Sequence, residues 1–135
     1  MAAVRHIAGL VLPALLAGGM ARAQDAATEP PKEEIAYLGI ETRMIDPELV
    51  EMRAALKGSA SDEAITAYLR CAVAQYALIR GMDTARQIRT VVSERFGKWT
   101  GEAVYMIGKG HPRGFDRVEA QEMVGECAVK GIPTV

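Results

Sequence analysis

The spacing of apolar residues after position 46 is that of amphipathic helices. Apolar side chains recur every three or four residues, which places them on one face of a helix with about 3.6 residues per turn. The pattern predicts helices over four segments: residues 46–57, 61–80, 84–106 and 116–130. The third segment is either one helix or two helices in line that break near Gly97, so we expect four to five helices.

Residues that begin and end helices support this division. Asp46 and Pro47 suit the N-cap and the first helical position, and Ser61 suits a second N-cap. Gly81 and Gly131 follow the last apolar positions of two segments, where glycine commonly ends a helix. The sequence therefore predicts an all-α fold, a small bundle or orthogonal array of four to five helices with one disulfide.

The segment from Ser61 to Arg80 is the most apolar part of the predicted domain, so we expect it at the centre of the fold. Its principal apolar face comprises Ile65, Leu69, Ala72, Tyr76 and Ile79. We assign residues 46–135 to this helical domain. Residues 24–45 begin with a polar stretch that contains two prolines, and we expect a flexible or weakly structured N-terminal segment there.

The first 23 residues have the three parts of a cleavable secretory signal. Arg5 supplies a positive head, residues 7–20 carry no charge, and residues 21–23 (Ala-Arg-Ala) form a small-residue cleavage site. The uncharged stretch is shorter than the roughly 20 residues that a membrane span needs. We therefore expect cleavage after residue 23, no transmembrane span afterwards, and an exported protein in the periplasm or outside the cell. A bacterial envelope is the favoured compartment.

Two cysteines, Cys71 and Cys127, follow the leader. In an oxidising compartment an isolated pair of this kind is typical of a structural disulfide. The bond would close a long loop and stabilise the fold by about 4 kcal/mol in the chain-entropy model. The alternatives are a redox dithiol, which usually has C-x-x-C spacing, and a zinc site, which needs about four ligands.

Composition narrows the classes of function. After residue 23 the chain has 14 basic and 17 acidic residues, a net charge of −3, whereas nucleic-acid-binding domains are usually clearly basic. His111 is the only histidine in that part, which leaves too few ligands for a zinc site. No cofactor motif or nucleophile elbow is present. We expect no nucleic-acid partner, no metal, no cofactor and, on balance, no catalytic activity.

Basic residues gather in the second half of the chain. The candidate site for an anion or a partner comprises Arg86, Arg89, Lys109, His111 and Arg113. The first two are expected one turn apart on the exposed side of a helix, and the others in a glycine-bounded loop just before the last helix. Such a surface suits an acidic protein, an anionic lipid or a glycan. The alternative is an ordinary solvated connector and helix face.

Three hypotheses about function remain. The leading one is an exported binding or accessory protein without catalytic activity. A second is a carrier of an apolar ligand or lipid, with a cavity between helices. The side chains available for that cavity are Tyr68, Tyr76, Phe96, Trp99 and Met106. The third is a small periplasmic hydrolase that uses paired carboxylates, for which Glu94, Glu102 and Glu126 are available.

Overall fold

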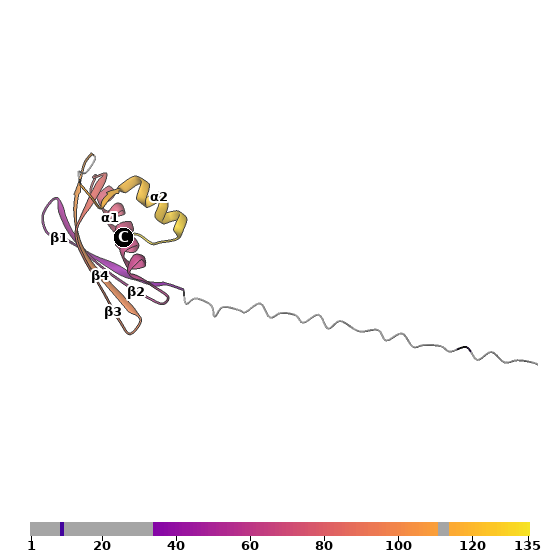
Figure 1. Ribbon diagram of the computed structural model, residues 1–135. Coiled ribbons are helices and arrows are strands. Elements are labelled where there is room, and N and C mark those ends of the chain that lie inside the picture. The colour runs from indigo at the N-terminus through magenta and orange to yellow at the C-terminus, as the bar shows by residue number, and fades with distance from the viewer. Residues whose placement is uncertain (1–8, 10–33, 111–113) are drawn as a thin grey trace, which may run out of the picture. The chain divides into compact units, whose positions relative to one another are not determined.

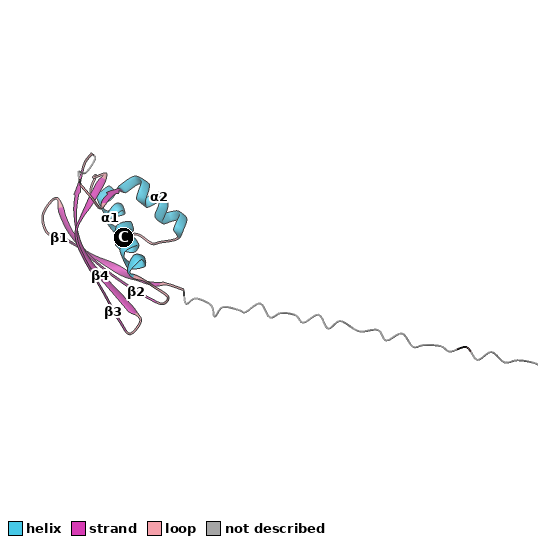
Figure 2. Ribbon diagram, in the orientation of Figure 1, coloured by secondary structure: helices cyan, strands magenta, loops and turns pink. Residues whose placement is uncertain are grey.

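The structure is a computed structural model that describes Gly9, residues 34–110 and residues 114–135. From residue 34 onward the chain forms an antiparallel sheet with helices on one side (Figures 1 and 2). The elements in chain order are β1 (Ala36–Met44), β2 (Leu49–Lys57), α1 (Asp62–Ile79), β3 (Thr84–Arg95), β4 (Lys98–Gly108), β5 (Arg117–Glu119) and α2 (Ala120–Lys130). The strand order across the sheet is β1-β2-β4-β3-β5.

This architecture contradicts the predicted all-α fold. Of the described residues, 29% are helical and 44% lie in strands. Residues 49–57, predicted as a helix, form β2, and residues 84–106 belong to a hairpin of β3 and β4. Residues 36–44, expected to be weakly structured, form β1. The helical-bundle prediction is wrong because the apolar spacing in these segments also fits the two-residue period of a strand.

Alternate side chains of the central strands form the core beneath α1. On β2 the buried side chains that face the helix are those of Val50, Met52, Ala54 and Leu56. On β4 they are those of Ala103, Tyr105 and Ile107. The intervening residues point to the opposite face of the sheet, since successive side chains of a strand alternate. One face of the sheet is therefore the core, and no element in the described part of the chain covers the other face.

Helix α1 is the central element that the sequence predicts, and this prediction is confirmed. The Ser61 side-chain oxygen accepts a hydrogen bond from the Ala64 N–H at 3.2 Å and caps the helix. The helix lies close to β4 at Gly101. A Cβ atom at that position would lie 2.8 Å from both Ile65 Cγ1 and Leu69 Cδ1. The absence of a side chain at Gly101 thus permits the close approach of helix and sheet.

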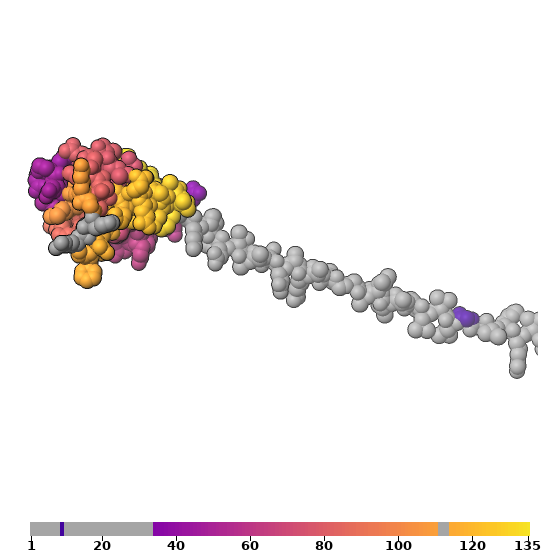
Figure 3. Space-filling view, turned by 90° about the horizontal axis from the view of Figure 1, so that it is seen from above, coloured from indigo at the N-terminus to yellow at the C-terminus, as the bar shows by residue number. Residues whose placement is uncertain are grey.

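Helix α2 packs against α1 and begins directly after β5. A disulfide joins Cys71 in α1 to Cys127 in α2, with 5.9 Å between their Cα atoms. Gly131, with φ of 67°, ends α2 in the left-handed conformation that favours glycine. In the space-filling view, the yellow residues of α2 lie at one end of the domain and the indigo residues of the β1–β2 turn at the other (Figure 3). The disulfide therefore stabilises the helical layer on the core face.

Candidate functional site

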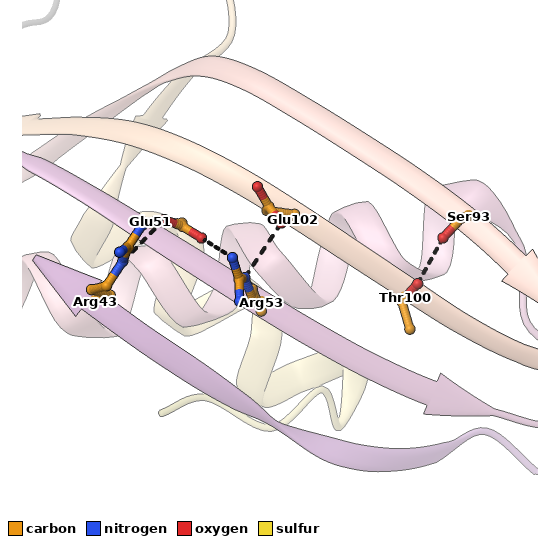
Figure 4. A network of polar contacts seen from close by, with 6 residues as sticks. All are labelled: Arg43, Glu51, Arg53, Ser93, Thr100 and Glu102. Carbon is orange, nitrogen blue, oxygen red and sulfur yellow. Dashed lines mark hydrogen bonds and ion pairs between the residues drawn. The ribbon is translucent and has the colours of Figure 1, made fainter. Parts of the chain in front are cut away.

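The uncovered face of the sheet carries a network of polar side chains (Figure 4). The Arg43 guanidinium binds the Glu51 carboxylate, and its Nε donates a hydrogen bond to Glu51 Oε2 at 3.2 Å. Arg53 Nη2 lies 2.8 Å from Glu51 Oε1, and Arg53 Nε lies 3.3 Å from Glu102 Oε2. The four side chains form an ion-pair chain that crosses β1, β2 and β4.

The ion-pair chain fixes the charge of Glu51. Only 7% of this side chain is exposed, whereas those of Arg43 and Arg53 are 72% and 57% exposed. The hydrogen bond from Arg43 lowers the pKa of Glu51 below its usual value, and the same contact raises the pKa of Arg43. Glu51 is therefore a carboxylate held ionised between two arginines, an arrangement that suits a positioned charge rather than proton transfer.

A row of small residues crosses the open face beside the ion-pair chain. Strand register aligns Gly39, Ala55, Thr100 and Ser93 across β1, β2, β4 and β3. Their small side chains leave a groove of about 540 Å³ between the taller rows on either side. The hydroxyls of Ser93 and Thr100 lie 2.8 Å apart on its floor (Figure 4). We call this feature the groove.

One side of the groove is a row of cations. Register places Lys57 of β2 opposite Lys98 of β4, and Lys98 opposite Arg95 of β3. We call these three residues the basic row. Like charges on directly opposed strand positions are destabilising. Within the described part of the chain, no carboxylate forms an ion pair with Lys57 or Lys98. The repulsion within the basic row is therefore not offset by a neighbouring acid there.

Charge is segregated between the two sides of the described domain. By register, the open face of β1 to β4 carries seven basic residues: Arg43, Arg53, Lys57, Arg86, Arg89, Arg95 and Lys98. The same face carries three acidic residues: Glu41, Glu51 and Glu102. The remaining described residues from 34 onward include five basic and eleven acidic ones. The open face is thus the basic side of a domain whose other described surfaces are acidic.

Comparison with known proteins gives the family. The family model described as the YNQ4 C-terminal domain matches residues 37–131, which include both helices and every strand except the first residue of β1. The chain belongs to the YNQ4 C-terminal domain family. It is also 34% identical over 85 residues to an uncharacterized 26.9 kDa protein in the nqo8 5′ region of Paracoccus denitrificans. No solved structure matches significantly.

The match to the Paracoccus protein covers 63% of this chain and 33% of that relative. The chain thus spans about a third of the length of the curated relative it matches. The open face lies within the part that defines the YNQ4 C-terminal domain, since strands β1 to β4, apart from Ala36, fall in the matched range. Neither description includes an activity.

Two of the predicted site residues, Arg86 and Arg89, lie on the open face of this YNQ4 C-terminal domain. In an uninterrupted strand, side chains three positions apart point to opposite faces. The register shift between Gln87 and Arg89 changes this, so that Arg86 pairs with Met106 and Arg89 with Val104. Both arginines therefore belong to the basic face, although they lie on β3 and not on a helix as predicted.

Of the other predicted site residues, the structure describes Lys109, which directly follows β4. Lys109 and Arg86 both line a second hollow of about 390 Å³, which also contains Glu48. His111 and Arg113 lie outside the described residues. Sequence reasoning did not select Arg53, Lys57 or Lys98, because the segments that contain them were assigned to helices. The alternation of Glu51, Arg53 and Lys57 with buried apolar residues is the signal that identifies them.

The side chains proposed for an apolar cavity are dispersed in the structure. Tyr68 is buried in the core, where its ring packs edge to face with Tyr37 at a centroid distance of 4.8 Å. Phe96 is 93% exposed at a hairpin turn, and Met106 points to the open face. These residues therefore do not line one cavity.

The described residues contain neither a metal-binding cluster nor a membrane-spanning helix. No group of three or more histidine, cysteine, aspartate or glutamate side chains within that part is arranged to hold a metal ion. None of its helices combines the length and apolar character that crossing a bilayer requires.

Proposed function

We propose that this chain is an exported, non-catalytic binding module whose ligand is an acidic segment of a partner protein, bound in the groove. Export rests on the signal-like leader and on a disulfide that suits an oxidising compartment. Mass spectrometry of the exported protein should then find a chain that begins at Gln24. An exported chain that still begins at Met1 would contradict the cleavage.

The observation that carries the proposal is the segregation of charge onto an uncovered surface. The open face of β1 to β4 has seven basic and three acidic residues, and neither of the two described helices packs on it. Complementary charge steers association and fixes which partners bind. An acidic ligand would relieve the repulsion within the basic row, whereas a basic ligand would add to it.

The dimensions of the groove favour an extended peptide. It crosses four strands, and neighbouring strands are about 4.8 Å apart, so its length between β1 and β3 is about 14 Å. At about 3.3 Å per residue, roughly four extended residues fit across it. The floor presents the Ser93 and Thr100 hydroxyls, and Leu38 and Val91 also line the groove. Acidic side chains of such a peptide can reach the basic row while its backbone meets the hydroxyls.

The arrangement of carboxylates supports binding rather than hydrolysis. Glu51 and Glu102 both contact Arg53, and the arginine contacts lower the pKa of Glu51. A general acid in glycoside hydrolysis needs a raised pKa instead. Glu94 and Glu126, the other two carboxylates considered, lie on β3 and α2. The geometry therefore favours a module that recognises charge.

Fluorescence anisotropy with a labelled twelve-residue polyglutamate peptide tests this function. We expect binding at low ionic strength that weakens steeply as salt is added. The double variant Lys57→Glu/Lys98→Glu should weaken binding at least about tenfold, or ~1.4 kcal/mol. Ala55→Phe, which fills the groove without changing charge, should weaken it as well.

The matched control reverses two cations in the helical layer, Arg80→Glu/Lys130→Glu, and so changes the net charge equally. We expect this variant to keep most of the affinity, with unchanged circular dichroism in all variants. If the two double variants lost equal affinity for the peptide, the loss would be explained by net charge alone. That result would refute the groove as the binding site. Full binding by Ala55→Phe would also refute it.

A further inference from the structure

The turn between β3 and β4 places an aromatic side chain in solvent. Phe96 and Gly97 form the two-residue connection, with φ values of 52° and 75°. The Phe96 side chain is 93% exposed. The Gly97 N–H donates a hydrogen bond to Glu94 Oε1 at 2.8 Å, which holds the turn closed. The tip of this hairpin is thus a well-defined apolar projection.

Neither turn geometry nor packing accounts for phenylalanine at this position. Two central residues with positive φ favour Asn-Gly or Asp-Gly, and a bulky residue in the left-handed region is unusual and unfavourable. The exposed ring gains no burial in the core. Its contact with Arg95, whose Cζ lies 5.4 Å from the ring centroid, is with another exposed side chain. The residue is therefore unfavourable for the isolated domain.

The basic row lies directly behind this aromatic tip. Arg95 and Lys98 flank the turn, and Lys57 is the next residue across the sheet. Glu94 is the acidic residue nearest in sequence to the tip, and its carboxylate is engaged by the turn. An aromatic side chain ahead of a belt of cations matches the interface of an anionic bilayer, where apolar rings enter the boundary between headgroups and acyl chains and cations meet lipid phosphates.

We propose that the Phe96 tip and the basic row dock this domain on an anionic lipid bilayer. Ala36, the first residue of β1, is opposite Lys57 in the same cross-strand row. The chain therefore enters the sheet at the end that carries the tip. The proposal does not depend on the peptide function, because it rests on the exposed ring and not on the groove. The two sites share the basic row, so a bilayer and an acidic peptide would draw on the same cations.

Sedimentation with vesicles tests the proposal on the chain that begins at Gln24. We expect binding to vesicles of phosphatidylcholine with about one third phosphatidylglycerol, and little binding to pure phosphatidylcholine. Each cation near an anionic surface contributes about a fivefold change in partitioning. Arg95→Gln/Lys98→Gln should therefore weaken binding by about 25-fold. Phe96→Asn should also remove most of it, while asparagine suits the turn and keeps the fold.

Phe115 provides a matched control, because its side chain is also 93% exposed but lies in the segment before β5. Phe115→Asn should leave vesicle binding unchanged, and Phe96→Asn should leave polyglutamate binding unchanged. Equal losses for Phe96→Asn and Phe115→Asn would overturn the assignment to the tip. Vesicle binding that survives Phe96→Asn would overturn it as well. A third contradicting result would come from analytical ultracentrifugation. It would be a dimer of the wild-type protein that Phe96→Asn converts to a monomer while vesicle binding stays the same.

Discussion

A methyl group added at Gly101 should destabilise the fold by forcing helix and sheet apart. In the structure, a Cβ atom at Gly101 would lie 2.8 Å from both Ile65 Cγ1 and Leu69 Cδ1. Carbon atoms prefer separations of about 3.5–4.0 Å, so each contact must open by roughly 1 Å. Overpacking of this kind costs about 1–3 kcal/mol. The reduced entropy of the unfolded chain offsets about 0.4–1 kcal/mol of this cost, so Gly101→Ala should lower the unfolding free energy by up to about 2.6 kcal/mol.

Urea denaturation followed by circular dichroism measures this change. Gly125→Ala is the matched control, because nothing lies within 4 Å of a Cβ atom at Gly125 in α2. That substitution should stabilise the protein by up to about 1 kcal/mol, since alanine favours a helix interior. Opposite signs for the two substitutions would support the close packing of α1 on β4. A stabilising effect at Gly101 would refute this packing.

Three other substitutions test the ion-pair chain, the disulfide and the core. Glu51→Gln should be destabilising at pH 7. The difference in unfolding free energy between this variant and the wild type should vanish as the pH falls below 4.5 and through the lowered pKa of Glu51. At that pH the wild-type Glu51 is protonated and no longer forms ion pairs with the arginines. A difference that is constant from pH 7 to pH 3 would contradict the pairing. Cys71→Ala/Cys127→Ala should lose up to about 4 kcal/mol, and the denatured, unreduced wild type should have no free thiol. Tyr105→Phe should be neutral or stabilising, because the buried Tyr105 hydroxyl has no hydrogen-bond partner among the described residues; a loss above about 1 kcal/mol would contradict this.

The sequence predicts the helices well where local signals agree with the tertiary fold. Ser61 begins α1 and Gly131 ends α2, as cap preferences indicate. Burial along α1 follows the predicted apolar face at Ile65, Leu69 and Ala72, whereas Ile79 at its end is 63% exposed. In α1 and at the end of α2, the three-four spacing of apolar residues and the capping residues both indicate a helix. The predicted start of the last helix at residue 116 is wrong, because Arg117–Glu119 pair with β3 as β5 and α2 begins only at Ala120.

The sequence does not predict the strands, because the spacing of their apolar residues fits both the 3.6-residue period of a helix and the two-residue period of a strand. Leu49, Met52 and Leu56 have helical spacing, yet β2 buries alternate residues. Asp46 is a good N-cap by type, but its Oδ1 accepts the N–H groups of Glu48 and Leu49, both at 2.8 Å, in a turn that leads into β2. Hydrogen bonds of this kind from an aspartate side chain can therefore begin a helix or stabilise a turn that precedes a strand.

The candidate site depends on strand pairing, which local patterns do not contain. Lys57, Lys98 and Arg95 come from three strands, and only the register places them in one row. Arg86 and Arg89 share a face because of the register shift between them. The sequence indicates an excess of cations in its second half, but it does not show that they gather on one side of a sheet. That segregation is a product of the fold.

Backbone amide chemical shifts, measured during titration with the acidic peptide, test the central claim most directly. If the groove binds the peptide, the largest changes should occur at Ala55, Ser93 and Thr100 and in the adjoining basic row. Amides of α1 and α2 should change little, because the sheet separates them from the open face. Changes confined to the helices, or spread evenly over the domain, would contradict the account.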